Sequence, residues 1–188
     1  MDKVNYVLKH PHLLAYLSYC FSYIGYGMLV TSLGPYIPYI AEDENRHETS
    51  YSFIFLCRAI GTILGSFLSK IWQKYFSFHR IIAFSLITFS LGSVSFGLAT
   101  SDFSRGLSML IACIGSSQLN VFEHLCIIET FKHDNLDAWL QINHGMFGVG
   151  GLIGPFLVFL LEKNTFLCLG LIGLLCAPPF FFLISPDS

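Results

Sequence analysis

The sequence predicts an all-α membrane protein, a single domain over residues 1–188 that crosses the bilayer as six helices. Composition is the first reason: 54% of the residues are hydrophobic and 12% are charged, whereas ordinary soluble domains carry about 25% charged residues. The second reason is that the apolar residues form six long runs, each near the ~20 residues that a helix needs to cross the hydrocarbon core. Because these runs are continuous and the chain is short, helices are favoured over the strands of a barrel.

The six apolar runs differ in the ionisable side chains that interrupt them. The first, third and sixth runs contain none, the second contains Arg58, and the fifth contains His144. The fourth contains Glu123 and His124. The first run is too long for the core of a signal peptide, so we expect it to remain as a membrane helix. The predicted spans are residues 13–40, 51–69, 81–99, 107–128, 139–161 and 166–184.

Lysine and arginine residues near the span ends predict the orientation. With the N-terminus inside, the inner segments contain Lys3, Lys9, Lys70, Lys74, Arg80 and Lys132, and the outer segments contain Arg46, Arg105 and Lys163. Basic residues are in excess on the cytoplasmic side of membrane proteins. We therefore expect both termini in the cytoplasm and the acidic loop at residues 41–50 on the opposite side.

Several classes of function are not indicated by the sequence. The net charge of −2 gives no sign of a nucleic-acid partner. All six cysteines lie inside apolar runs without C-x-x-C spacing, so neither a zinc site nor a disulfide framework is predicted. There is no Ser–His–Asp arrangement, metal-ligand cluster or phosphate-binding glycine loop in the sequence pattern. We therefore expect no enzyme activity, no cofactor and no metal.

Polar residues inside the predicted spans are the candidates for a substrate pathway, because an ionisable group in lipid is costly and usually functional. In the fourth span, Asn120 and Glu123 share a helix face with Ser116. In the fifth span, Gln141 and His144 share a face with Gly148, Gly151 and Pro155, and in the second span Arg58 shares one with Gly61 and Gly65. The alternatives are a structural Arg58–Glu123 ion pair, or a Glu123 side chain that reaches the inner interface. We expect His124 to be interfacial.

Tyrosines form a stripe along the first span, at Tyr16, Tyr19, Tyr23 and Tyr26. An aromatic face suits a sugar ring, and Tyr23 and Tyr26 are therefore added to the pathway candidates. Packing and anchoring at the membrane interface are the alternative roles of such a stripe.

Three segments carry a resemblance to a known family: RAIGTILGSFLSK (58–70), CIGSSQLN (113–120) and LQINHGMFGVGGLIGPFL (140–157). Over about residues 13–184 the chain resembles the N-terminal six-helix half of a major facilitator superfamily transporter. It is most similar to the branch of sodium-dependent glucose transporter-like and fucose-permease-like proteins. The resemblance implies two six-helix halves around a central cavity and alternating access for a sugar or similar small solute.

The sequence departs from the family pattern at two positions. Ser69 precedes Lys70 where the family's loop after the second helix usually has an acidic residue. Ser116 stands where the branch commonly has a carboxylate, four residues before the asparagine that matches Asn120. Glu123 lies on the same face and is the residue that could take over the role of that carboxylate.

Three classes of function follow from these observations: a half-transporter, a transporter-derived subunit that scaffolds a larger membrane complex, and a membrane-embedded enzyme, which has the weakest support. Small-x-x-x-small pairs at Gly61–Gly65 and Gly150–Gly154, followed by Pro155, indicate close helix packing. In the resembled family these helices border the opposite half. We therefore expect the glycine pairs to face a partner, either a second copy or a partner subunit, although contacts within this half would explain them equally well.

Overall fold

The computed structural model describes residues 11–133, 135–183 and 185–186. These residues form helices, and no strand occurs among them. The α-helices are α2 (Pro11–Asp43), α3 (Ser52–Trp72), α4 (Phe78–Leu98), α5 (Asp102–Phe131), α6 (Leu136–Leu161), α7 (Thr165–Cys176) and α8 (Pro179–Phe182), with short 3-10 helices η1 (Glu48–Tyr51) and η2 (Glu162–Asn164).

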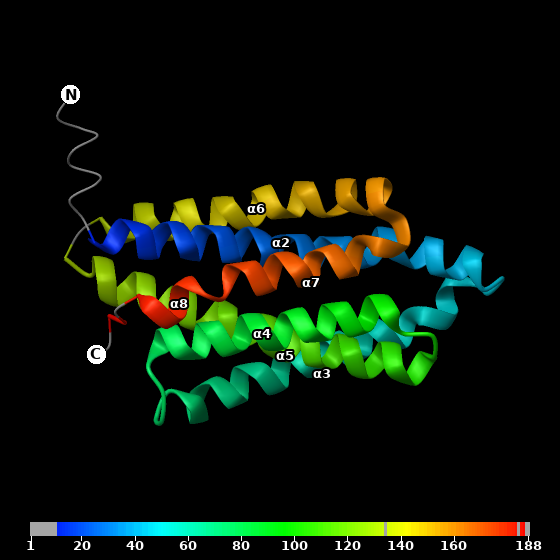
Figure 1. The fold of residues 1–188 in the computed structure, drawn as a ribbon, viewed down its shortest axis with the longest axis horizontal. Coiled ribbons are helices and arrows are strands. Elements are labelled where there is room, and N and C mark those ends of the chain that lie inside the picture. The colour runs from blue at the N-terminus through cyan, green and yellow to red at the C-terminus, as the bar shows by residue number, and fades with distance from the viewer. Residues whose placement is uncertain (1–10, 134, 184, 187–188) are drawn as a thin grey trace.

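Among the described residues, five stretches are long and apolar enough to cross a membrane, which confirms the all-α membrane class. The count of six separate spans is not confirmed, because the last stretch, Leu136–Phe182, contains the fifth predicted span and all but the last two residues of the sixth, of which residue 184 lies outside the described residues. Within it the chain reverses at η2, so that α6 and α7 run in opposite directions (Figure 1). α7 has only 12 residues, because Pro178 and Pro179 follow it and proline supplies no N–H donor to continue a helix.

The observed helices extend beyond the predicted spans at their polar ends. α2 continues to Asp43, and α5 begins at Asp102. Hydropathy detects only the apolar length of a helix and not its polar end turns. The start of α5 is set instead by Ser101, which caps the helix by accepting a hydrogen bond from the Ser104 N–H.

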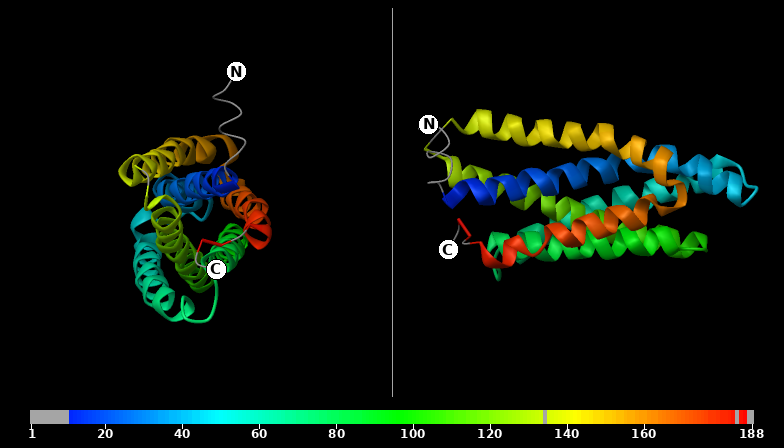
Figure 2. Two further views of the ribbon diagram at one scale, coloured as in Figure 1. Left: turned by 90° about the vertical axis from the view of Figure 1, so that its left-hand side faces the viewer. Right: turned by 45° about the horizontal axis from the view of Figure 1, so that its top comes forward.

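The helices pack into one bundle made of two groups (Figures 1 and 2). One group consists of α2 and α6, and the other consists of α3, α4 and α5, with α7 in contact with both. α2 packs along α6 and also contacts α7, while α5 lies between α3 and α4, and α7 packs against α4. Aromatic residues fill the core between the groups, with Tyr36, Phe96 and Phe166 near one end and Tyr19, Phe122 and Phe180 near the other. The beginning of α2 and the end of α8 lie at the same end of the bundle (Figure 1).

The glycine pairs pack against helices of this same chain. A Cβ at Gly61 would lie 2.5 Å from the carbonyl oxygen of Leu110, and one at Gly65 would lie 2.5 Å from that of Ile114, both on α5.

Gly150 and Gly154 on α6 pack against α2 in the same way, since a Cβ at Gly154 would lie 2.7 Å from the carbonyl oxygen of Met28. All four glycines therefore make close contacts within this half, as the alternative explanation has it, and a partner for the chain stays a prediction. Pro155 is exposed on α6, on a different side from this contact.

Candidate functional site

An open cavity of about 560 Å³ lies among α2, α5 and α6. Its walls combine aromatic rings with amide and imidazole groups. The lining residues are Tyr23, Tyr26, Asn120, Val121, His124, Leu125, His144 and Phe147.

Hydrogen bonds connect the polar wall of the cavity across helices. The Tyr23 hydroxyl of α2 donates to Asn120 Oδ1 of α5 over 2.6 Å. His124 Nδ1 donates to the Asn120 carbonyl oxygen over 2.7 Å, and His124 Nε2 lies 3.4 Å from His144 Nε2 of α6. A polar strip thus runs from α2 through α5 to α6.

Aromatic rings form the second wall. Phe147 contacts both tyrosines, with ring centroids 5.8 Å from Tyr23 and 5.3 Å from Tyr26. Tyr23 also contacts the rings of His124 and His144, at 5.5 Å and 6.1 Å. Such a wall offers ring faces beside hydrogen-bonding groups, which is the usual make-up of a small-molecule site.

The structure brings four of the seven pathway candidates to the cavity: Tyr23, Tyr26, Asn120 and His144. Gln141 is exposed and is not among the lining residues. The tyrosine stripe divides in two, because Tyr16 donates to the Trp139 carbonyl oxygen over 2.7 Å and Tyr19 contacts His79 in the core.

Glu123 lies away from the cavity lining, fully buried between α5 and α2. Its Oε1 accepts a hydrogen bond from the Ser22 hydroxyl, and its Oε2 has no hydrogen-bond partner within the described residues. A helix turns about 100° per residue, so Glu123 is rotated by about 60° from Asn120 and by about 100° from His124. It therefore faces Ser22 of α2 rather than the cavity. Burial of this side chain also corrects the alternative that it reaches the interface.

Arg58 lies beside a smaller cavity of about 110 Å³ that it shares with Tyr26 and Ser116. Its Nη1 donates to the Val30 carbonyl oxygen over 3.1 Å. No ion pair joins Arg58 to Glu123 in the described part of the chain, so the structural ion pair is not formed.

Sequence reasoning missed four residues of this region. His124, expected at the interface, and Phe147 both line the cavity, and the i, i+4 spacing of Asn120 and His124 was the signal for the first. Ser22, the partner of Glu123, is a small hydroxyl residue that hydropathy does not single out. Asn143, which is fully buried on α6, is a polar residue in an apolar run, and this was the signal for it.

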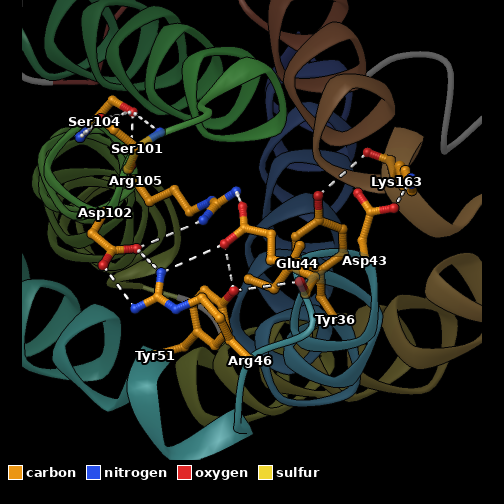
Figure 3. Close-up of polar contacts among 11 residues, drawn as sticks. Tyr36, Asp43, Glu44, Arg46, Tyr51, Ser101, Asp102, Ser104, Arg105 and Lys163 are labelled. Carbon is orange, nitrogen blue, oxygen red and sulfur yellow. Dashed lines mark hydrogen bonds and ion pairs between the residues drawn. The ribbon is translucent and has the colours of Figure 1, made fainter.

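A second polar cluster lies at the end of the bundle where α2 meets α3 (Figure 3). Arg46 forms two hydrogen bonds with the Asp102 carboxylate, of 2.8 and 2.9 Å, and Arg105 pairs with Glu44. The Tyr51 hydroxyl donates to Glu44 Oε2 over 2.7 Å. The hydrogen bonds from Arg105 and Tyr51 lower the pKa of Glu44 from 4.5 to about 2.

The same cluster extends to the link between α6 and α7 (Figure 3). Lys163 Nζ donates to Asp43 Oδ1 over 2.6 Å, and the Tyr36 hydroxyl donates to the Lys163 carbonyl oxygen over 3.4 Å. All three basic residues predicted for the outer segments therefore pair with acidic residues at one end of the molecule.

Comparison with known proteins assigns the sequence to a family. The sequence pattern of the Major Facilitator Superfamily matches residues 15–188. The chain belongs to the Major Facilitator Superfamily. The resemblance that the sequence indicated is confirmed, and this superfamily member also has curated relatives in the expected branch.

Three relatives carry names of sodium-dependent glucose transporters. Sodium-dependent glucose transporter 1 of Danio rerio is 29% identical over 153 residues, covering 79% of this chain and 25% of the relative. The protein of that name from Homo sapiens is 27% identical over 138 residues, covering 73% of this chain and 26% of the relative. Sodium-dependent glucose transporter 1A of Mus musculus is 28% identical, covering 72% of this chain and 32% of the relative. This superfamily member thus spans between a quarter and a third of the length of these relatives.

Proposed function

We propose that the chain forms one half of an alternating-access transporter that moves a small, sugar-like solute across a membrane. The observation that carries the proposal is the cavity among α2, α5 and α6, where hydroxyl, amide and imidazole groups lie beside aromatic rings inside a membrane-spanning bundle. Its volume of about 560 Å³ is within the range of small-molecule sites. Membership of a transporter superfamily and the names of the relatives support a sugar-like solute rather than an enzyme or a scaffold.

Tyr23, Tyr26, Asn120 and His144 contact the solute in this proposal. Their groups can accept and donate hydrogen bonds to hydroxyls, while the rings of Tyr26 and Phe147 cover an apolar face. Glu123 and Arg58 lie outside this contact shell. We assign Glu123 the role of holding α5 against α2 through Ser22.

A second half completes the proposed site. The cavity is open, and His144 of its lining is exposed on α6, as are Gly145 and Gly148. A histidine is costly to leave against hydrocarbon at membrane depth, so this side requires cover by protein and water.

The test is binding of radiolabelled glucose to the protein purified in its native assembly and placed in nanodiscs. Tyr23→Phe keeps the ring and removes the hydroxyl that orients Asn120. We expect it to weaken glucose binding by about tenfold, the equivalent of one hydrogen bond of roughly 1.4 kcal/mol.

Tyr75→Phe is the matched control, because Tyr75 is 74% exposed and lies outside the cavity. It should bind glucose as the wild type does. Equal binding by Tyr23→Phe and Tyr75→Phe would remove the cavity from the proposed function.

A further inference from the structure

His124 and His144 form a pair of imidazoles on the wall of the cavity, contributed by two different helices. The Nε2 atoms lie 3.4 Å apart, and the ring centroids lie 4.9 Å apart. Because the nitrogens are closer together than the centroids, both Nε2 vertices point toward the space between the rings. His144 is exposed, and this space opens into the cavity.

The hydrogen bond at the other nitrogen of His124 sets its tautomer. His124 Nδ1 lies 2.7 Å from the Asn120 carbonyl oxygen, and a carbonyl oxygen can only accept. Nδ1 therefore carries the proton, and Nε2 of the neutral ring presents a lone pair toward His144. Histidines that bind metal ions are oriented in this way, by donating the other ring N–H to a backbone carbonyl or a carboxylate.

The separation of the two nitrogens matches the ligand spacing of zinc. Two Zn–N bonds of about 2.0–2.1 Å at a tetrahedral angle place their nitrogens about 3.4 Å apart, and the observed distance is 3.4 Å. We propose that His124 and His144 form a two-histidine site for a transition-metal dication, with Zn²⁺ as the ion that fits the geometry. The site shares His144 with the proposed solute contacts and opens into the same cavity.

Two coordination positions of the ion stay open in this site. No group of three or more His, Cys, Asp and Glu side chains that could hold a metal occurs in the described residues, so His124 and His144 are the two ligands that these residues supply. The open cavity of about 560 Å³ has room for water or another small ligand in the remaining positions. The spacing of histidines along the sequence could not indicate this site, because its two ligands come from different helices, α5 and α6, rather than from one sequence motif.

Zinc binding to the purified protein in nanodiscs, without an affinity tag, tests the proposal directly. We expect ⁶⁵Zn²⁺ to bind the wild type, and His124→Gln and His144→Gln each to weaken the binding by about tenfold or more, since each removes one of two nitrogen ligands. His47→Gln and His133→Gln are matched controls, because both residues are exposed and lie outside the cavity. They should keep wild-type affinity.

Cu²⁺ as a paramagnetic probe distinguishes a bridged pair from two independent histidines. Pulsed electron paramagnetic resonance counts the imidazoles on the bound ion: we expect two in the wild type and one in His144→Gln. His144 is exposed, so this variant should keep its fold, which circular dichroism checks. One imidazole in the wild type, or equal Zn²⁺ affinity in the wild type and His144→Gln, overturns the metal site. Both readouts are independent of glucose binding, so the metal site and the proposed transport function can fail separately.

Discussion

The buried Glu123–Ser22 contact shows how much one hydroxyl can matter inside the bundle. Ser22 is 1% exposed and donates to the Glu123 carboxyl group, which is itself fully buried. A buried polar atom that loses its only partner bears the whole cost of leaving water, about 1–3 kcal/mol.

We therefore predict that Ser22→Ala lowers the free energy of unfolding by about 1–3 kcal/mol. Thermal unfolding in detergent measures the change. Ser18→Ala is the matched control, because Ser18 lies on the same helix and donates only to the Leu14 carbonyl oxygen of its own helix. Similar unfolding of both variants would show that the contact with Glu123 contributes nothing.

The cavity residues could be predicted from the sequence only in part. Asn120 and His144 were recognisable as polar groups in apolar runs, and the structure places both at the cavity. Glu123 was the most conspicuous residue by the same criterion, yet it points toward Ser22. Which of two adjacent residues faces a cavity depends on how the helix is rotated against its neighbours, and hydropathy does not give that rotation.

In the α2–α6 contact, glycine residues determine how closely the two helices approach each other. Gly150 and Gly154 lie against the α2 backbone, whereas a Cβ at Gly148, on another side of α6, would have no described atom within 4 Å. Substitutions at Gly154 and at Gly148 can therefore distinguish packing within this half from a contact with another half.

We predict that Gly154→Leu separates α2 from α6 and lowers the melting temperature, because no space exists for the side chain. Gly148→Leu should leave the melting temperature unchanged and reduce association with the proposed second half. Circular dichroism gives the first comparison, and native mass spectrometry gives the mass of the assembly. A Gly148→Leu variant that keeps the full assembly mass would mean that the second half does not cover this side of α6.

The helix boundaries show where prediction from sequence stops. The first four apolar runs became α2, α3, α4 and α5, because a long apolar segment in lipid has to satisfy its backbone as a helix. The sixth run ended early at Cys176 because of two consecutive prolines, which hydropathy counts as ordinary residues. Pro178 and Pro179 were visible in the sequence and were the signal for this break.

At the scale of the whole molecule, the cluster around Glu44 connects the ends of several helices and should respond to acid. The pKa of Glu44 is about 2 in the folded protein and 4.5 as its ordinary value. A carboxyl group with a lowered pKa stabilises the fold fully above its unfolded pKa and loses this contribution as the pH falls through the folded one.

We predict that the wild type loses stability between about pH 4.5 and pH 2, and that Glu44→Gln loses less over this range. Thermal unfolding at a series of pH values measures the difference. Glu42→Gln, an exposed glutamate two positions earlier, is the control and should follow the wild type. A wild-type curve no steeper than that of Glu44→Gln would show that the cluster does not contribute to the pH dependence.

The direction of the whole bundle in the membrane is a further prediction. The excess of basic residues near Lys70 and Lys74 predicts that this link lies in the cytoplasm and the α2–α3 link outside. In sealed cells, a membrane-impermeant thiol reagent should label Asn45→Cys and should not label Gln73→Cys, two exposed positions on the two links. Labelling of both from outside would contradict the proposed orientation.

The length of α2 has a consequence for the environment of the charged cluster. α2 has 33 residues, about 50 Å at 1.5 Å per residue, which exceeds the ~30 Å of hydrocarbon by several turns. Its end and the start of α3 project beyond the neighbouring helices (Figure 1), so the exposed Arg46–Asp102 pair meets dissolved ions. Salt at 1 M shortens the reach of such charges to about 3 Å, while the Ser22–Glu123 contact is shielded from the solution. High ionic strength should therefore weaken the charged contacts at this projecting end of the protein and leave the buried Ser22–Glu123 contact unchanged.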